Sequence, residues 1–293
     1  MAAQHHHRPK NPILYVNGKW LRQREATVPF MDSGFWYGDG LFETLRVANS
    51  NIFRADKHLA RMREGMRFLE FDFPVPDEHV VALMEELIQR NSVNNTLLRL
   101  MCTRGTLEGA PWKHQGLSNL YIGFRYIDPV PSFPVKVMFV QEQTYPLGRR
   151  DPAIKSMTYL PNMLATRDVV AQGAFEPVFV NRDGLVTECA TRNIFFVKEN
   201  TLHTPDLSLG ILPGVTRDLI LCLAEDLGLS VNTSPIDAED VNTMDEAFIS
   251  STGIGVYPCT WDGFTSTEYP ISLRLRKAVE DQVQAETASR DQP

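Results

Sequence analysis

Residues 153–162 read Ala153-Ile154-Lys155-Ser156-Met157-Thr158-Tyr159-Leu160-Pro161-Asn162. Lys155 lies between an apolar, strand-like approach and a helix predicted over 161–171. A lysine that forms a Schiff base must be neutral to attack an aldehyde, and a partly desolvated position favours that form. On spacing alone a surface lysine is the better interpretation. The sequence motifs elsewhere in the chain must decide between a surface lysine and one that forms a Schiff base.

The composition sets the broad class of the protein. The chain has 293 residues, 43% of them apolar, which is enough for a sizeable core in one large or two medium domains. Its formal charge is −7, and no basic stripe indicates a nucleic-acid partner. The longest apolar runs fall far short of the roughly 20 residues that a membrane span requires. We therefore expect a soluble globular protein with neither a nucleic-acid nor a membrane partner.

The chain start and the cysteines indicate its setting. Residues 1–10 are polar and basic and precede no apolar stretch of signal-peptide length, which predicts a cytoplasmic protein. The His5-His6-His7 run is interpreted as a tag-like end rather than a metal site. Four widely spaced cysteines form no C-x-x-C pair: Cys102, Cys189, Cys222 and Cys259. We interpret them as reduced core thiols and expect neither disulfides nor a bound metal.

Proline marks one seam in the chain, at Asp128-Pro129-Val130-Pro131-Ser132-Phe133-Pro134. The seam predicts a small N-terminal domain over 1–128, an interdomain linker over 129–134 and a large C-terminal domain over 135–293.

The first domain is predicted to be α+β, because its strands and helices occur in separate runs. Asn17-Gly18 favours a hairpin turn between two strands. Asp56 is expected to cap a helix whose apolar face includes Leu59 and Met62. Further elements are expected as strands over 41–47, 52–53, 96–103 and 120–126 and as a helix over 78–89.

Short apolar segments recur after the seam and predict a second α/β domain with a barrel-like sheet. The predicted strands cover 135–140, 178–180, 193–197 and 247–250. The predicted helices cover 161–171, 216–227 and 271–285.

Several ordered motifs resemble the class IV aminotransferases, the fold-type IV family of pyridoxal-phosphate enzymes. The family carries K-x-x-x-Y or K-x-x-x-x-Y, then G-x-x-x-E-x-x-x-x-N-x-F, then L-x-G-x-T-R. The matching positions here are Lys155 with Tyr159, then Gly184 to Phe195 with Glu188 as the acidic residue, then Leu212 to Arg217. The N-terminal signatures match Tyr37-Gly38-Asp39-Gly40-Leu41-Phe42-Glu43-Thr44 and Phe53-Arg54-x-x-x-His58-Leu59-x-Arg61. Five ordered elements over about 250 residues are a specific signal.

The resemblance implies a two-domain α+β fold, with a small N-terminal α/β sandwich-like domain and a larger C-terminal pseudo-barrel domain. It implies a homodimer and the cofactor pyridoxal 5'-phosphate, held by Lys155 as a Schiff base. Glu188 would face the pyridine nitrogen and keep it protonated, so that the ring accepts electrons from a carbanion. By itself, Glu188 is equally a solvated glutamate at a strand end.

The same resemblance assigns the other cofactor-binding residues. Tyr159 would hydrogen-bond the ring's phenolic oxygen, and Arg54 would bind the phosphate with its two-pronged guanidinium. Gly214-Val215-Thr216 opens an amphipathic helix whose N–H groups and dipole suit the same phosphate. Ser251-Thr252 would contribute a second hydroxyl contact, and Thr191 also belongs to the expected set.

The implied reaction is an amino transfer in two half-reactions. An amino acid displaces Lys155 from the cofactor, and the freed lysine moves a proton between the α-carbon and the cofactor's C4′. Hydrolysis releases an oxo acid, and a second oxo acid runs the sequence backwards.

The substrate motifs depart from each known subfamily. Tyr37 to Gly40 and Thr103-Arg104-Gly105 resemble D-amino acid transaminases and aminodeoxychorismate lyases. The D-specific tyrosine is Phe42 here, and Gly109-Ala110-Pro111 replaces an R-x-H carboxylate trap. Glu43, where lyases commonly have threonine, favours transamination.

We therefore expect a transaminase that moves an amino group between an amino acid, with a preference for D-amino acids, and a 2-oxo acid such as 2-oxoglutarate or pyruvate. Our hypothesis is that Arg192, with Arg104 or Arg99, binds the substrate carboxylate beside Phe42 and Tyr37. Arg99 matches an arginine of branched-chain enzymes, which leaves an L-branched-chain transaminase open, and an aminodeoxychorismate lyase is the third alternative.

Overall fold

The computed structural model describes residues 10–70, 73–110, 112, 117–125 and 132–288. The His5-His6-His7 run, Pro111 and the first part of the predicted linker, 129–131, lie outside the described residues. The chain forms two compact units. Unit 1 comprises Met1–Asp128, Ile154–Thr158 and Val283–Pro293, and unit 2 comprises Pro129–Ala153 and Tyr159–Gln282.

This division differs from the single boundary that proline placement predicts. Two stretches of described residues beyond that boundary, Ile154–Thr158 and 283–288, belong to unit 1. The segment around Lys155 does so because it pairs with a strand of the N-terminal sheet, a long-range contact that a local proline pattern does not report.

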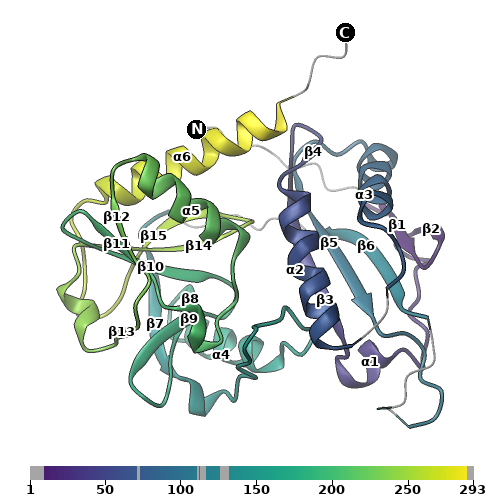
Figure 1. The fold of residues 1–293 in the computed structure, drawn as a ribbon, viewed down its shortest axis with the longest axis horizontal. Coiled ribbons are helices and arrows are strands. Elements are labelled where there is room, and N and C mark those ends of the chain that lie inside the picture. Colours follow the sequence, from purple (N-terminus) through teal and green to yellow (C-terminus); the bar gives the residue numbers. More distant parts are fainter. Residues whose placement is uncertain (1–9, 71–72, 111, 113–116, 126–131, 289–293) are drawn as a thin grey trace. The chain divides into compact units, whose positions relative to one another are not determined.

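Unit 1 is built on a six-stranded sheet (Figure 1). Every neighbouring pair in it is antiparallel. The strand order is β2 (Lys19–Arg22), β1 (Ile13–Val16), β6 (Asn119–Arg125), β5 (Thr96–Thr103), β3 (Gly40–Ala48) and β4 (Asn51–Ile52). Asn17 and Gly18 both have positive φ, at 49° and 84°, so the predicted β1–β2 hairpin is confirmed.

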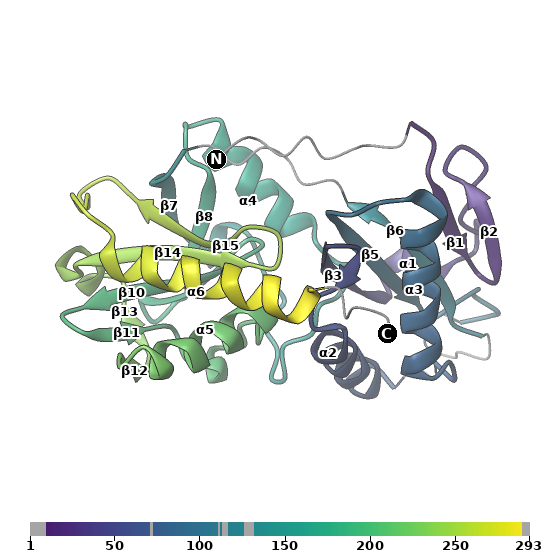
Figure 2. The same cartoon turned by 90° about the horizontal axis from the view of Figure 1, so that it is seen from above.

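Two helices cover the same face of this sheet (Figure 2). They are α2 (Ala55–Phe68) and α3 (Asp77–Asn91), and their apolar stripes pack on alternate residues of β3, β5 and β6. The expectation that Asp56 caps α2 is wrong. Arg54 is the N-cap residue, in a left-handed conformation with φ 51° and without a side-chain cap, and Asp56 lies in the first turn.

A short helix, α1 (Ser33–Tyr37), precedes β3. Its N-cap residue Asp32 accepts hydrogen bonds from the backbone N–H groups of Gly34 and Phe35. The buried carboxylate of Asp32 also accepts from the hydroxyls of Thr103 and Tyr121, on β5 and β6. The segment that carries Tyr37 is therefore fixed to the sheet.

One charged residue of β3 points into the helix-covered core. The carboxylate of Glu43 is fully buried and accepts hydrogen bonds from Arg61 Nε at 2.8 Å and Nη2 at 2.7 Å. Because an ionised carboxylate only accepts, the contact at 2.8 Å requires that His58 Nδ1 carries the proton. Arg61 of the R-x-x-x-H-L-x-R motif thus neutralises a buried charge, and His58 donates a further hydrogen bond to it.

Unit 2 is built on a nine-stranded sheet. The strand order is β12 (Ser230–Asn232), β11 (Thr201–His203), β10 (Asn193–Lys198), β14 (Glu246–Ser251), β15 (Gly255–Thr260), β7 (Val135–Gln141), β8 (Glu176–Val180), β9 (Leu185–Cys189) and β13 (Ile236–Asp237). Parallel pairs join β7 to β8, β15 to β7 and β11 to β12.

The connection from β9 to β10 requires this sheet to curl. Five strand spacings separate β9 from β10 in the sheet order, which is about 24 Å in a flat sheet. The chain joins Cys189 to Asn193 through three residues, and four extended steps span at most about 14 Å. The ends of the sheet must therefore approach each other, and the predicted barrel-like sheet is confirmed.

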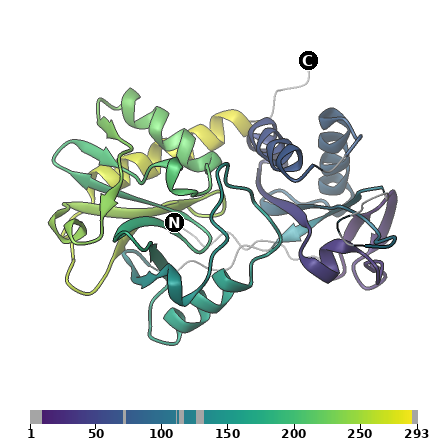
Figure 3. The same cartoon turned by 60° about the horizontal axis from the view of Figure 1, so that its bottom comes forward.

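Three longer helices belong to the second half of the chain, namely α4 (Leu160–Val170), α5 (Val215–Asp226) and α6 (Pro270–Thr287). The short 3-10 helices are η1 (Glu142–Thr144), η2 (Leu207–Leu209) and η3 (Asp240–Thr243). Figure 3 shows the teal connection between β7 and α4 as largely irregular chain. Buried apolar side chains of the curled sheet form the core of unit 2.

The expectation that the four cysteines are reduced thiols in the core is confirmed for three of them. Cys102, Cys189 and Cys259 are buried free thiols, whereas Cys222 is free but exposed on α5. The expectation that Cys222 is a core residue is therefore wrong. The apolar face of α5 instead carries Leu219, Ile220 and Ala224.

We expect Glu43→Gln to lower the free energy of unfolding at pH 7 by about 3 kcal/mol, because it removes one partner of a buried ion pair. Burial by itself would raise the pKa of Glu43, but Arg61 and His58 outweigh burial and lower the pKa from 4.5 to about 2. The ionised carboxylate therefore contributes stability above pH 4.5 that is lost as the pH falls towards 2.

Urea unfolding of both proteins between pH 7 and pH 3.5 measures the effect, with Glu64→Gln on the exposed side of α2 as the control. The stability difference should narrow as the pH falls. A difference that stays constant over this range, or a control that is equally destabilised, would contradict the interpretation.

Candidate functional site

The segment around Lys155 pairs with the first residues of β3. Phe42 N–H donates to Lys155 C=O at 3.0 Å, and Met157 N–H donates to Gly40 C=O at 2.9 Å. Ser156 forms an antiparallel bridge with Leu41 between these two bonds. Lys155 therefore lies on a short added strand at the edge of β3 and is half-buried.

Glycine at position 40 allows this close approach. A Cβ atom there would lie 2.6 Å from Met157 Sδ and 2.7 Å from Cys102 C=O, closer than side-chain carbons pack. The G-D-G element thus has a structural reason in this chain, because its second glycine admits the lysine segment to the sheet.

One aromatic ring contacts two of the predicted site cations. Lys155 Nζ lies 4.7 Å from the centroid of Phe42, and the guanidinium carbon of Arg99 lies 3.5 Å from the same centroid. Arg99 faces Thr44 across the β3–β5 ladder and donates to its hydroxyl at 3.1 Å. The structure thus brings together Lys155, Phe42 and Arg99.

Arg104 and Tyr37 have other surroundings: Arg104 pairs with Asp39, and Tyr37 is exposed at the end of α1. Arg104 donates to both carboxylate oxygens of Asp39, at 2.7 and 3.2 Å, and to Leu69 C=O at 2.9 Å. These contacts tie the T-R-G element to the G-D-G element. Tyr37 closes α1 with 54% of its surface exposed.

Arg54, the predicted phosphate ligand in unit 1, is paired with a carboxylate of the same unit. Its Nε and Nη2 donate to Glu286 Oε1 at 3.1 and 3.0 Å, and its guanidinium lies 5.4 Å from the ring centroid of Phe53. The pairing shows that two N–H groups of this guanidinium can donate to one anion.

Glu188 lies on β9 in unit 2, where both of its carboxylate oxygens have partners. Arg149 Nη1 donates to Oε1, and Leu212 N–H donates to Oε2 at 3.2 Å. The Glu188 side chain keeps 16% of its surface exposed, and a carboxylate has about four acceptor sites, so it retains capacity for a further donor.

The turn between β9 and β10 follows Glu188 in sequence and is linked to Tyr159 by a hydrogen bond. The Tyr159 hydroxyl donates to Ala190 C=O at 3.0 Å, and Asn162 Nδ2 donates to the same oxygen at 2.9 Å. The start of α4 is thereby fixed to the turn that follows Glu188.

Thr191 and Arg192 are directed at a buried carboxylate. Glu176 on β8 accepts from Thr191 N–H at 2.9 Å and from the Thr191 hydroxyl at 3.1 Å, and it forms an ion pair with Arg192 Nη1. Arg192 also stacks on Phe175 at 4.8 Å. Burial raises the pKa of Glu176, and the Arg192 charge opposes that shift.

Both side chains are engaged with Glu176, because a fully buried carboxylate needs the hydrogen bonds that Thr191 donates and the countercharge that Arg192 supplies. That Arg192 binds the substrate carboxylate and that Thr191 binds the cofactor stay predictions.

The start of α5 suits a phosphate. Gly214 is the N-cap residue and makes no side-chain cap, and the N–H groups of the first helical turn have no partners within the helix. A Cβ atom on Gly214 would clash with Asn193 Oδ1, so only glycine leaves this cradle open. Val215 and Thr216, the first two helical residues, are buried at 7% exposure each.

Two hydroxyl-bearing residues, Ser250 and Thr252, belong to the region of unit 2 around the start of α5. Asn193 pairs in register with Ser250, whose buried hydroxyl has no hydrogen-bond partner among the described residues. Thr252 follows at the β14–β15 turn and is half-buried. An open helix start, an unpaired hydroxyl and a threonine at a turn form a donor set that fits a phosphate group.

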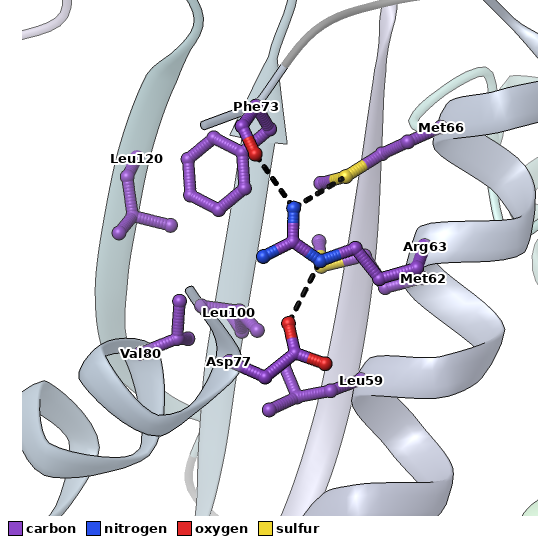
Figure 4. Close-up of a pocket in the computed structure, with 9 residues that line it drawn as sticks. All are labelled: Leu59, Met62, Arg63, Met66, Phe73, Asp77, Val80, Leu100 and Leu120. Carbon is purple, nitrogen blue, oxygen red and sulfur yellow. Dashed lines mark hydrogen bonds and ion pairs between the residues drawn. The ribbon is translucent and has the colours of Figure 1, made fainter. Parts of the chain in front are cut away.

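A separate pocket lies in unit 1, and its lining includes none of the predicted cofactor- or substrate-binding residues (Figure 4). It lies between α2, α3 and the sheet, with Met62, Met66 and Leu100 in its lining. Arg63 closes it by donating to Asp77 at 2.7 Å and to Phe73 C=O. Its lining is core, so we do not assign it to the reaction.

The described residues contain no group of three or more His, Cys, Asp or Glu side chains that could hold a metal ion. Within that part of the chain, every helix is too short or too polar to cross a membrane.

The comparisons with known proteins agree with this fold and these motifs. The sequence profile described as amino-transferase class IV matches residues 40–260. A putative branched-chain-amino-acid aminotransferase of Methanocaldococcus jannaschii is 30% identical over 84% of this chain and 86% of its own. A D-alanine aminotransferase of Bacillus licheniformis is 30% identical over 94% and 98%. An aminodeoxychorismate lyase of Bacillus subtilis is 29% identical over 85% and 86%.

The solved branched-chain aminotransferase of Thermoproteus uzoniensis, determined with norvaline, superposes with a TM-score of 0.85 at 22% identity over 96% of this chain and 97% of that chain. The fold is that of the fold-type IV enzymes. The chain belongs to the class IV aminotransferases and is an aminotransferase enzyme. Its cofactor is pyridoxal 5'-phosphate, and neighbours of this fold carry phosphopyridoxyl-glutamate and pyridoxamine 5'-phosphate.

Three residues near Glu188 were not predicted from the sequence. Arg149 contacts Glu188, Glu142 contacts Arg149, and Glu176 holds the turn after Glu188. Each lies outside the family motifs and contacts its partner across at least seven residues of sequence, so spacing carries no signal for it.

Proposed function

We propose that this aminotransferase moves an amino group between an amino acid and a 2-oxo acid, with D-amino acids as the preferred donors. The observation that carries the amino transfer is that Lys155 and Arg99 contact one ring, that of Phe42. The preference for D-amino donors rests on the sequence motifs and on a similar protein. A permanent cation next to the reacting amine suits an α-carboxylate, because the carboxylate is attached to the carbon that carries the amino group.

When bound, pyridoxal phosphate supplies an aldehyde for the amine and a ring that accepts electrons. In our proposal Lys155 holds the cofactor and moves the proton between the substrate's α-carbon and the cofactor's C4′. Glu188 keeps the pyridine nitrogen protonated, and Tyr159 hydrogen-bonds the ring hydroxyl. Arg54, the start of α5 and Thr252 bind the phosphate.

Two observations support D-amino donors over branched-chain L-donors. The Asp39–Arg104 ion pair joins the two elements that resemble D-amino acid transaminases and aminodeoxychorismate lyases. A D-alanine aminotransferase is similar over 94% of the chain. Glu43, which stands where lyases commonly have threonine and forms a buried ion pair with Arg61, favours transamination over the lyase reaction.

The second candidate is an L-branched-chain transaminase. Arg99 favours it, because branched-chain enzymes often carry an arginine at that position, and a branched-chain enzyme is among the similar proteins. The third candidate, an aminodeoxychorismate lyase, would use the same lysine and the same cofactor contacts.

A panel of D- and L-donors with 2-oxoglutarate or pyruvate separates the candidates. We expect kcat/KM for D-alanine or D-glutamate to exceed that for L-leucine and L-glutamate by at least about tenfold. Arg99→Ala should raise KM for both the amino acid and the oxo acid by about 10- to 100-fold, because each loses a charged hydrogen bond, and should leave cofactor affinity unchanged.

Arg67→Ala, an exposed change on α2, is the matched control and should leave both KM values unaltered. A preference for L-leucine would sink the D-amino acid proposal in favour of the second candidate. Release of pyruvate from aminodeoxychorismate without an acceptor would support the lyase. Unchanged KM values in Arg99→Ala would remove Arg99 from the substrate site.

We also propose that the enzyme is a homodimer. The resemblance to class IV aminotransferases implies it, and exposed apolar side chains cluster on and before α1 in unit 1, namely Val28, Phe30, Phe35, Trp36 and Tyr37. Such clusters mark association surfaces. The mass in solution should be twice that of the 33.2 kDa chain, and a monomeric mass at assay concentration would contradict the proposal.

A further inference from the structure

Arg149 lies between two carboxylates of unit 2. Its Nε and Nη2 donate to Glu142 Oε1 at 2.9 and 2.6 Å, and its Nη1 donates to Glu188 Oε1. Nη2 also donates to the Thr187 hydroxyl at 3.0 Å. The planar guanidinium is therefore fixed along both of its edges, and Glu188 is held by a group with little freedom to move.

Thr187 orients Glu142 from the side of the sheet. Its hydroxyl donates to Glu142 Oε1 at 2.7 Å, so Glu142 accepts from Thr187 as well as from Arg149. Thr187 precedes Glu188 on β9, and its side chain therefore points to the other face of that strand. Glu142 and Glu188 are thus connected both through Arg149 and through the backbone of β9.

The three charges are partly withdrawn from water. The exposed fractions of the side chains are 21% for Arg149, 13% for Glu142 and 16% for Glu188. Burial lowers the pKa of the Arg149 guanidinium, but Glu188 and Glu142 outweigh burial and raise the pKa above its usual value. Arg149 therefore stays charged, and the cluster carries one net negative charge when both carboxylates are ionised.

We propose that Arg149 is a positioning residue that holds Glu188 for the cofactor's pyridine nitrogen. In this proposal Glu142 neutralises the Arg149 charge, so that the net negative charge of the cluster remains at Glu188. The inference rests on the proposed function only in that it takes Glu188 as the partner of that nitrogen.

Both parts of the cluster are needed for electrostatic reasons. A guanidinium without Glu142 would oppose a protonated pyridine, because like charges a few ångströms apart repel even at an effective dielectric constant near 20. Two carboxylates without Arg149 would repel each other, and one of them would then take up a proton or move away. Only the complete cluster presents an ionised, fixed carboxylate.

The test compares Arg149→Gln, Glu142→Gln and the double variant in the full-length enzyme. The readouts are the Kd for pyridoxal phosphate, the absorbance spectrum of the bound cofactor, and kcat with the best donor. We expect Arg149→Gln to raise the Kd about tenfold and to lower kcat by about 10- to 100-fold through misplacement of Glu188.

The double variant distinguishes charge balance from simple packing. Arg149→Gln leaves two facing carboxylates, whereas the double variant removes one and restores the net charge of the wild type. We therefore expect the Kd and kcat of the double variant to lie closer to the wild-type values than those of Arg149→Gln. Losses that add or exceed the sum of the single variants would overturn the proposal.

Arg150→Gln is the matched control, because it removes the same charge from the neighbouring, exposed residue. It should leave the Kd, the spectrum and kcat unchanged, and an effect equal to that of Arg149→Gln would overturn the proposal. Thermal unfolding of each variant measures any general loss of structure. Arg149→Lys keeps the charge and should recover part of the Kd loss.

Glu188→Gln separates failure of this inference from failure of the proposed site. If Glu188→Gln leaves the cofactor spectrum and Kd unchanged, the assignment of Glu188 to the pyridine nitrogen is wrong, and this inference is wrong with it. If Glu188→Gln changes them while Arg149→Gln does not, only the role given to Arg149 is wrong.

Discussion

The position of Lys155 depends on two backbone hydrogen bonds to the first residues of β3. Phe42 donates to Lys155 C=O and Met157 donates to Gly40 C=O, so the lysine segment becomes an added strand of the N-terminal sheet. The pairing requires glycine at position 40, because any side chain there would overlap Met157 and Cys102. It also sets Lys155 beside Phe42, and through that ring beside Arg99. The substrate-binding part of our account follows from this short stretch of sheet pairing.

Arginine–carboxylate pairs recur around the functional segments. Arg61 neutralises Glu43 behind β3, Arg104 fixes Asp39, and Arg192 neutralises Glu176 behind the turn after Glu188. Buried or half-buried carboxylates of this kind stabilise a unique arrangement only when a partner and enough hydrogen bonds are present.

These pairs also narrow the choice among the three candidate arginines for the substrate carboxylate. Arg104 and Arg192 are engaged by carboxylates of the chain itself. Arg99 instead lies against the ring of Phe42, which Lys155 also contacts. Because of this place beside Lys155, Arg99 leads the proposal for substrate binding.

Local patterns predicted the elements that depend on local physics. Asn17-Gly18 predicted its hairpin, alternating apolar residues predicted β3 and β5, and apolar periodicity predicted α2, α3 and α5. The family motifs likewise predicted the start of α5 as a phosphate cradle, because a glycine N-cap and a helix start are adjacent in sequence. Short strands such as β12 and β13 were missed because two or three residues carry too little periodicity.

The sequence did not reveal interactions that are distant along the chain. Glu176, which lies on a strand fifteen residues earlier, accepts hydrogen bonds from Thr191 and Arg192. Arg149 donates a hydrogen bond to Glu188, thirty-nine residues away in sequence. The position of Arg192 in the motif therefore suggested a substrate ligand, and no motif includes its partner Glu176.

The central claim, that Lys155 holds the cofactor, is tested most directly by locating the covalent bond. The enzyme is loaded with pyridoxal phosphate, reduced with borohydride, digested and mapped by mass spectrometry. Our account predicts that the phosphopyridoxyl group is on the peptide that contains Lys155. A modification found on another lysine, with the Lys155 peptide unmodified, would contradict it.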